Sequence, residues 1–205
     1  MRGKVVVLEG MDGSGKSTIL REVAGQLEAL DVKHCQFAFP SRHNGAIGGL
    51  IRDVLEGKVV VQEEAMLWLF TAEGIQMETT LHEAAQRGEI VLCDRHTAIS
   101  ALVYQTAIHR LEDIFAVNQI ADFAAPDLIY IVDVPVDVAL SRRKSRGGST
   151  AVFYEPTEIK KLEDMRFKYL NLVARVGYTS LIDGTLPVAV NAKKIVQEIL
   201  GAVQG

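Results

Sequence analysis

The chain has 205 residues, of which 48% are hydrophobic, and a formal net charge of −4. This length suffices for one globular domain, which we expect to span residues 1–205, and the charge excludes the overall basic field of many nucleic-acid-binding proteins. No apolar run is long enough to cross a membrane and none precedes the first strand, so we expect a cytoplasmic protein without nucleic-acid or membrane partners. Cys35 and Cys93 lie in apolar runs and are expected to be reduced core residues.

The chain opens with an apolar run at residues 4–9, a glycine-rich turn, and helical spacing over residues 18–30. Residues 10–17 read GMDGSGKS and match the phosphate-loop pattern G-x-x-x-x-G-K-[ST] at every fixed position. Lys16 would reach the outer phosphates of a nucleoside triphosphate, and the Ser17 hydroxyl would ligate Mg²⁺. The remaining phosphate-binding groups are the residues of the loop and of the following helix start: Gly10, Asp12, Gly13, Ser14, Gly15 and Thr18. A glycine-rich turn without a ligand is the alternative, but strand, loop and helix agree on a phosphate site.

Further along the chain, short apolar runs alternate with helical patterns. The runs at 34–39, 89–94, 128–134 and 180–183 predict strands, and helices are predicted at 62–87, 100–123 with a break near His109, 135–146, 158–176 and 190–203. This alternation predicts an α/β fold of three layers, α/β/α, with a five-stranded parallel sheet. In such sheets ligands bind beyond the carboxyl ends of the strands.

Charged side chains follow the predicted strands at those ends. Arg42 lies just after the second strand, and Asp94 and Arg95 end the third. Phosphoryl transfer needs cations around two phosphate groups and a carboxylate near the metal, so Arg42 and Arg95 could bind phosphate while Asp94 assists Mg²⁺. A surface ion pair is the alternative role for each arginine.

The segment 142–149 reads RRKSRGGS, a basic helix end that runs into a glycine-rich loop. Cations are favourable at a helix C-terminus, so a solvated helix end is one interpretation. Beside a phosphate loop we favour a mobile lid at about residues 142–155, which would bring arginines over the transferring phosphate.

Five segments together resemble the thymidylate kinases, which phosphorylate dTMP with ATP. They are, in chain order, LEGMDGSGKST, FPSRHNGAIGGLIRDVL, DRHTAISALVYQ, PDLIYIVDVPVDVALSRRKSRG and LIDGTLPVAVNAKKIVQEI. The resemblance covers nearly the whole chain, and it implies a homodimer in which the apolar helix around Leu67, Trp68 and Leu69 could supply the contact face.

The resemblance also implies roles for individual residues. Lys16 and Ser17 would bind the ATP phosphates and Mg²⁺, and Asp12 would lie near the 3′-hydroxyl of the acceptor. Arg42 and Arg95 would hold the acceptor phosphate, and Phe39 is a further predicted substrate-binding residue. The loop has no arginine, so the lid would supply the transition-state cation. The predicted lid arginines are Arg142 and Arg146, with Arg143 as an additional candidate.

The predicted base and sugar site consists of Phe70, Ser100 and Tyr104. By resemblance, Phe70 would stack on the pyrimidine, and Tyr104 would pack on the deoxyribose and disfavour a 2′-hydroxyl. From the residues alone, Phe70 could equally be a core residue on an apolar helix face. His96, beside Arg95, is expected to pack or position, since an anionic acceptor phosphate needs little help from a base.

Two departures from the family pattern concern the base. Gly74 stands where family members usually place an arginine that contacts the base. Gln76 could replace the lost hydrogen-bond donor, and the gap leaves room for a larger base substituent. One extra residue between Arg95 and Tyr104 makes Ala101 the residue after the family serine. These departures suggest relaxed selectivity toward dUMP or 5-substituted pyrimidines.

Other activities are a kinase for another deoxynucleoside monophosphate, a deoxynucleoside kinase, or a nucleotide switch. A deoxynucleoside kinase would need a carboxylate base for a neutral hydroxyl, and a GTPase-type switch would need an N-K-x-D segment, which the sequence lacks.

Overall fold

The computed structural model describes residues 2–41, 45–123, 125–145, 156–175 and 179–204. Within them, a five-stranded sheet has the order β2-β3-β1-β4-β5, and every neighbouring pair is parallel. The strands are β1 (Val5–Glu9), β2 (His34–Ala38), β3 (Ile90–Asp94), β4 (Leu128–Asp133) and β5 (Thr179–Asp183). The predicted strands are confirmed to within one residue at each end.

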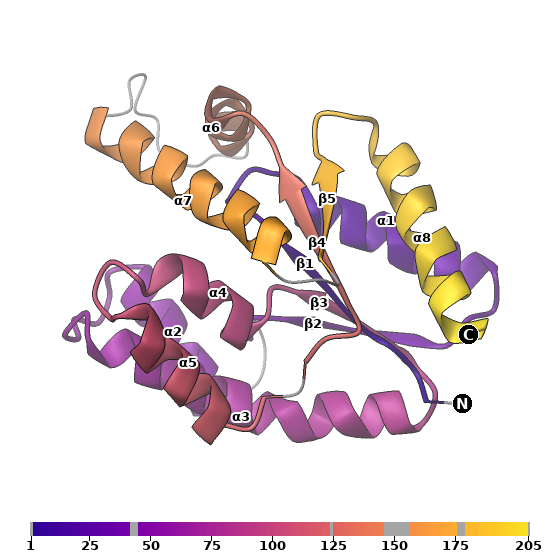
Figure 1. Cartoon of the computed structure of the whole chain (residues 1–205), viewed down its shortest axis with the longest axis horizontal. Coiled ribbons are helices and arrows are strands. Elements are labelled where there is room, and N and C mark those ends of the chain that lie inside the picture. The colour runs from indigo at the N-terminus through magenta and orange to yellow at the C-terminus, as the bar shows by residue number, and fades with distance from the viewer. Residues whose placement is uncertain (1, 42–44, 124, 146–155, 176–178, 205) are drawn as a thin grey trace.

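Helices cover both faces of this sheet, as the predicted three layers require (Figure 1). Helices α1 (Lys16–Ala29) and α8 (Val188–Gln204) pack together on one face, and α3 (Ala65–Gln86), α4 (Thr97–Tyr104) and α7 (Pro156–Arg175) lie on the other. The remaining helices are α2 (Ala46–Leu55), α5 (Leu111–Ile120) and α6 (Val136–Ser145). The predicted break near His109 is confirmed, because α4 and α5 are separate helices.

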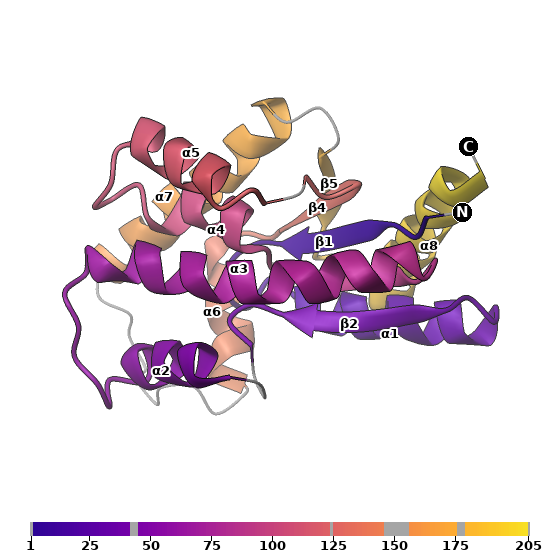
Figure 2. The ribbon, with the colours of Figure 1, turned by 90° about the horizontal axis from the view of Figure 1, so that it is seen from below.

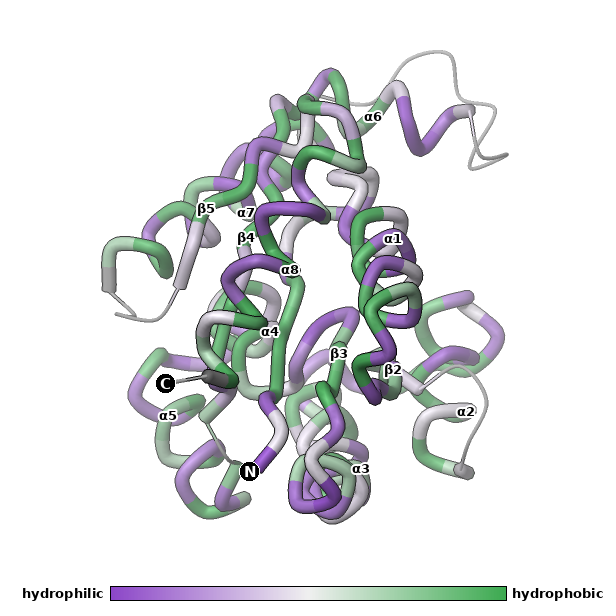
Figure 3. Tube along the Cα trace, turned by 90° about the vertical axis from the view of Figure 1, so that its right-hand side faces the viewer, coloured by the Kyte–Doolittle hydropathy of each residue, from purple (hydrophilic) through white to green (hydrophobic). Residues whose placement is uncertain are grey.

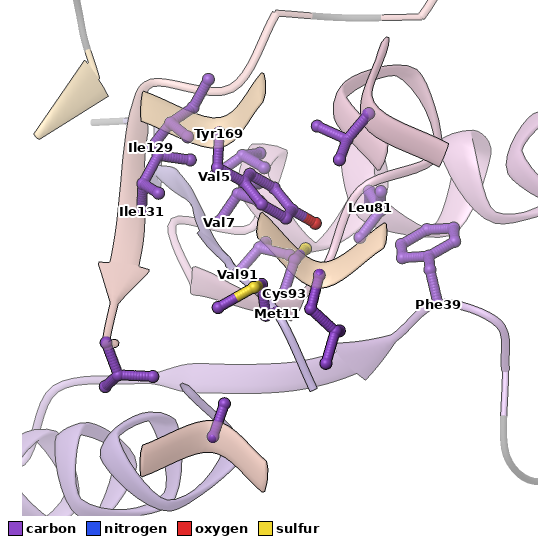
Figure 4. Close-up of a cluster of buried hydrophobic side chains, with 14 of the residues drawn as sticks. Val5, Val7, Met11, Phe39, Leu81, Val91, Cys93, Ile129, Ile131 and Tyr169 are labelled. Atoms are coloured by element: carbon purple, nitrogen blue, oxygen red, sulfur yellow. The ribbon is translucent and has the colours of Figure 1, made fainter. Parts of the chain in front are cut away.

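Alternate residues of each strand enter two separate cores. Val5 and Val7 face the side of α3 and α7, where Figure 4 shows them beside Val91 and Cys93. Val6 and Leu8 face α1 and α8 instead. A strand buried on both faces is apolar throughout, which is why the central strands read as continuous hydrophobic runs.

Helix α1 buries one apolar side and leaves its polar side exposed. Along α1, apolar and polar stretches alternate with the helix turns (Figure 3), and Ile19, Val23 and Leu27 are buried under α8 and the sheet.

Cys35 and Cys93 are free thiols, as expected. Leu67 is buried in a small core with α4 and α5, so its predicted place on a dimer face is wrong; its neighbour Trp68 is 60% exposed.

The segments that carry the charged residues lie at the carboxyl ends of the strands. Figure 2 shows β1 and β2 pointing toward the end of the molecule that holds α2 and α6, with both chain termini at the opposite end. In the part of the chain that the structure describes, no helix combines the length and apolar character needed to cross a membrane.

Candidate active site

The predicted phosphate loop forms the turn between β1 and α1. Gly10 and Gly13 have φ values of +144° and +92°, which side-chain-bearing residues rarely adopt. A Cβ at Gly13 would lie 2.3 Å from the Ala139 carbonyl oxygen, and one at Gly10 would lie 2.5 Å from that of Val132. The loop therefore packs its main chain directly on β4 and α6, and Gly15 leads into α1. Such a turn presents main-chain N–H groups and a helix N-terminus to an anion.

Lys16 and Ser17 begin α1 at the floor of the site. Lys16 is buried, and its Nζ lies 3.5 Å from Asp12 Oδ1. Burial and the positive charge of Arg95 lower the pKa of Lys16, although nearby carboxylates oppose this shift. The Ser17 hydroxyl donates a hydrogen bond to Asp94 Oδ2 at 2.5 Å. A hydroxyl beside a carboxylate suits Mg²⁺, which prefers oxygen ligands and takes its others from phosphates and water.

Arg95 follows β3 with φ +77°, a strained value for a residue with a side chain. Its Nη2 donates to Asp12 Oδ1 at 2.7 Å, and its Nη1 donates to Glu9 Oε2 at 3.2 Å and to the Tyr169 hydroxyl at 3.0 Å. Its guanidinium carbon lies 5.2 Å from the centre of the Tyr104 ring. Arg95 is thus held by four side chains at the rim of the site.

Asp12 lies between the two cations. Its side chain is 69% exposed to solvent, yet its Oδ1 is within 4 Å of both Lys16 and Arg95. The walls of the site raise the pKa of Asp12 by desolvation, but the two cations outweigh this effect and lower it. Asp12 is therefore ionised at neutral pH.

Glu9 is a site residue that the residue-by-residue reasoning did not single out. It is fully buried, and it accepts hydrogen bonds from Arg95, Tyr169, the His96 main-chain N–H and the Ser100 hydroxyl. The signal that could have revealed Glu9 is its position, an acidic residue at the end of a buried strand. Tyr169 had no such signal, since it lies in an ordinary amphipathic helix.

A cavity of about 1030 Å³ opens above these residues. Of the predicted site residues, it is lined by Asp12, Gly13, Gly15, Lys16, Ser17, Phe39, Phe70, Asp94, Arg95, Ser100 and Tyr104. Gly10, Ser14, Thr18 and Arg142 do not line it, and Arg42 and Arg146 lie outside the described residues. The lining residues Arg52 and Gln105 were not predicted as site residues, although both lie in segments that resemble the family, because no role follows from either residue type alone.

The predicted lid arginines on α6 take different places. Arg142 donates from Nη1 to the Ser14 carbonyl and from Nη2 to the Gly184 carbonyl, both at 3.0 Å, and so links the phosphate loop to the turn after β5. Arg143 lines the cavity, and its Nη1 lies 3.7 Å from Glu158 Oε1. Arg143, the additional candidate, is thus closer to the open site.

The loop after β2 is tied to two helices through Ser41. The Ser41 N–H donates to Glu73 Oε1 of α3 at 2.5 Å, and Arg52 of α2 donates to the Ser41 carbonyl at 2.7 Å. A Cβ at Gly48 would lie 2.6 Å from Glu73 Oε1, so a larger residue there would displace this carboxylate. Burial raises the pKa of Glu73, although Ser41 and Arg52 oppose the shift.

The expectation of open space at Gly74 is wrong. A Cβ there would lie 2.7 Å from the Phe123 ring and 2.9 Å from Thr97 Oγ1, so these side chains already fill the position. Gln76 is exposed on α3 and does not line the cavity, so it does not replace the arginine that the family pattern places at 74. Ala101 does line the cavity, beside Gln105.

His96 packs between aromatic rings. Its ring centre lies 6.0 Å from that of Phe39 and 6.1 Å from that of Phe123. Burial lowers the pKa of His96 to about 4, so the ring is neutral at pH 7. This placement agrees with a packing residue and not with a base at the reacting phosphate.

Comparison with known proteins shows the family of this chain. The family model described as thymidylate kinase matches residues 8–195. The thymidylate kinase of Pseudomonas fluorescens is 34% identical over 156 residues, covering 72% of this chain and 71% of that protein. The thymidylate kinase of Pelotomaculum thermopropionicum is 32% identical over 184 residues, covering 85% and 82%. With its phosphate loop, its strand order and a family match over nearly its whole length, this chain belongs to the thymidylate kinase family.

Proposed function

We propose that the protein transfers the γ-phosphoryl group of ATP to dTMP, giving ADP and dTDP. The observation that carries this proposal is the meeting of two cations around one point: Asp12 Oδ1 lies 3.5 Å from Lys16 Nζ and 2.7 Å from Arg95 Nη2. Lys16 belongs to the phosphate loop of residues 10–17, the donor loop in this proposal because it would bind ATP. Arg95 follows a different strand, so two phosphate groups could approach each other between these residues. Family membership supports the choice of ATP and dTMP.

In this proposal the protein mainly positions and neutralises charge. Main-chain N–H groups of the loop and Lys16 bind the ATP phosphates, while Arg95, with Arg42 after β2, holds the acceptor phosphate. Cations placed in advance around the transferring group stabilise the charge of the transition state. The acceptor oxygen is already anionic, so no side chain has to remove a proton.

Mg²⁺ would be held by the Ser17 hydroxyl and Asp94, and when bound it neutralises charge on the donor phosphates. The lid at about 142–155 would bring Arg142, Arg143 or Arg146 to the transferring group. Gly10, Ser14 and Thr18 complete the donor loop in this proposal.

The other end of the cavity suits a pyrimidine deoxynucleotide. Phe70 offers a ring on which a base could stack, and Tyr104 offers one for the deoxyribose. The Gln105 side chain carries both a donor and an acceptor, which matches the mixed hydrogen-bonding edge of thymine. Asp12 would lie near the 3′-hydroxyl, with Ser100 and Phe39 shaping the wall.

We further propose a single kinase domain over residues 1–205 that acts in the cytoplasm as a homodimer. Trp68 and Ile75 are 60% and 49% exposed on α3 and do not line the cavity. Phe115 is 51% exposed on α5, which packs beside α3. Large apolar side chains exposed on adjacent helices are typical of protein interfaces. Free cysteines suit a reducing compartment.

ADP release by the purified protein tests the proposal. With ATP and Mg²⁺ present, we expect dTMP to be the best acceptor among dTMP, dUMP, dCMP and the purine deoxynucleotides, and thymidine to be inert. Conversion of thymidine would instead indicate a deoxynucleoside kinase. Failure to convert any nucleoside monophosphate would refute the proposed activity.

A further inference from the structure

We propose that Tyr169 of α7, together with Glu9 of β1, is a positioning residue for the acceptor phosphate, because the two hold Arg95 from its buried side. The inference rests on the proposed function, in which Arg95 binds that phosphate. Tyr169 and Glu9 themselves do not line the cavity, so their effect on the substrate must pass through the guanidinium.

The Tyr169 hydroxyl both donates and accepts a hydrogen bond in this arrangement. It donates to Glu9 Oε2 at 2.9 Å and accepts from Arg95 Nη1 at 3.0 Å. The side chain is only 2% exposed, and its ring lies beside Val5 and Val7 in the core below α7 (Figure 4). Buried hydrogen bonds of this kind restrict rotation, so they define where the guanidinium can lie.

The two sides of Arg95 differ in what holds them. Nη1 faces Glu9 and Tyr169, which are buried and anchored by further contacts, whereas Nη2 faces Asp12, whose side chain is 69% exposed. An exposed carboxylate can move aside when an anion arrives, but the buried pair cannot. Nη2 therefore remains available to bind an anion in the cavity, while the hydrogen bonds of Nη1 hold the long side chain in place.

Pre-organisation matters here because an arginine side chain loses considerable rotamer freedom when it binds a ligand. The Tyr104 ring adds a surface for the guanidinium at 5.2 Å, and it stands edge-on to the Tyr169 ring at 6.4 Å. Tyr169 also links α7 to the ends of β1 and β3. Removal of its hydroxyl alone should leave this packing intact and loosen only the guanidinium.

The experiment compares the binding of dTMP with that of thymidine, which lacks the phosphate, by calorimetry. In Tyr169→Phe we expect about a tenfold loss of dTMP affinity and less than a twofold loss for thymidine. The KM for dTMP should rise by a similar factor while the KM for ATP stays unchanged. A general disturbance of the fold would weaken both ligands alike.

Tyr130→Phe is the matched control. Tyr130 is also a fully buried tyrosine, and its hydroxyl donates to Glu198 at 2.8 Å on the opposite face of the sheet. This variant loses a tyrosine–glutamate hydrogen bond without touching Arg95, so both affinities should remain as in the unmodified protein.

Arg95→Ala separates failure of this inference from failure of the proposed function. If Arg95→Ala loses dTMP selectively but Tyr169→Phe does not, the positioning role is refuted and the phosphate role of Arg95 stands. If Arg95→Ala weakens both ligands equally, the proposed phosphate role itself fails. Should Tyr169→Phe not fold, Glu9→Gln provides the second test, because an amide has one oxygen fewer to accept hydrogen bonds from Arg95 and Tyr169. A loss of affinity for dTMP but not for thymidine supports the inference. Equal losses of affinity for the two ligands overturn it.

Discussion

The two ends of the active site are built in different ways. The proposed donor end is one continuous turn, residues 10–17, whose main chain would bind the ATP phosphates and whose glycines allow it to pack on β4 and α6. The acceptor end is assembled from side chains of β1, β3, α2, α3, α4 and α7, which are far apart in the chain. A surface made of main chain can be recognised from a short motif, whereas one made of converging side chains depends on the whole fold.

Buried carboxylates mark the acceptor end. Glu9 accepts hydrogen bonds from four groups, and Glu73 holds the Ser41 N–H. A buried charge is costly unless it is hydrogen-bonded, so each carboxylate constrains the groups around it. The donor end instead uses one buried cation, Lys16, among main-chain dipoles.

Lys16→Ala should produce the largest effect, because it removes the buried cation of the donor end. We expect kcat to fall by about 10³-fold or more, measured by ADP release at saturating ATP and dTMP. Lys33→Ala, at an exposed position before β2, is the control and should behave as the unmodified protein. Near-normal turnover of Lys16→Ala would show that the donor loop does not act through its side chains.

Gly13→Ala tests whether the donor loop depends on its main-chain geometry. A Cβ would meet the Ala139 carbonyl oxygen at 2.3 Å while φ is +92°, so we expect a loss of about 3 kcal/mol in the free energy of unfolding. The same change at Gly25, which is exposed on α1 with nothing within 4 Å of its Cβ position, should stabilise by about 0.5–1 kcal/mol. Urea denaturation of both variants measures the contrast, and equal effects would contradict it.

The buried, neutral His96 makes the free energy of unfolding depend on pH. Its pKa is about 4 in the folded protein and 6.5 when unfolded, so the unfolded state binds more protons between these values. Stability from this residue is fully present above pH 6.5 and is lost as the pH falls toward 4, by as much as about 3 kcal/mol. In His96→Phe the free energy of unfolding should fall less over this range; parallel pH profiles of the two proteins would disprove the assignment.

Glu73 variants test the side-chain support of the acceptor end, with the smallest expected effect. Glu73→Ala leaves the Ser41 N–H without its acceptor and should raise the KM for dTMP about tenfold, since a broken buried hydrogen bond costs about 1–3 kcal/mol. The KM for ATP should stay unchanged.

Glu73→Gln keeps an acceptor oxygen and should remain within about twofold of the unmodified protein. Glu83→Ala, at an exposed position on the same helix, controls for effects on α3. A rise in the KM for ATP as large as that for dTMP would show that the two ends are not independent.

Much of the fold could be predicted because its signals are local. The central strands are buried on both faces and therefore read as apolar runs, and the loop between β1 and α1 needs glycines for steric reasons. Helix α2 is not among the helices predicted from residue spacing, because its two glycines, Gly48 and Gly49, are poor helix formers.

Base selectivity shows the limit of such reasoning. The absence of a side chain at Gly74 suggested empty space, but Phe123, almost fifty residues away in the chain, occupies it. No spacing rule could reveal this contact, because it depends on how the segment after α5 returns to the sheet. The same holds for Tyr169 and Glu9, which are 160 residues apart and share a hydrogen bond.

Short-range patterns of apolar residues, glycines and charges are enough to predict the layered α/β architecture, the donor loop and the family. The side chains that meet at the acceptor end, the contacts that hold Arg95 and the ring that fills the position beside Gly74 are known from the folded structure alone. Neighbouring residues specify a main-chain turn, whereas contacts between buried side chains depend on the packing of elements that lie far apart in the chain.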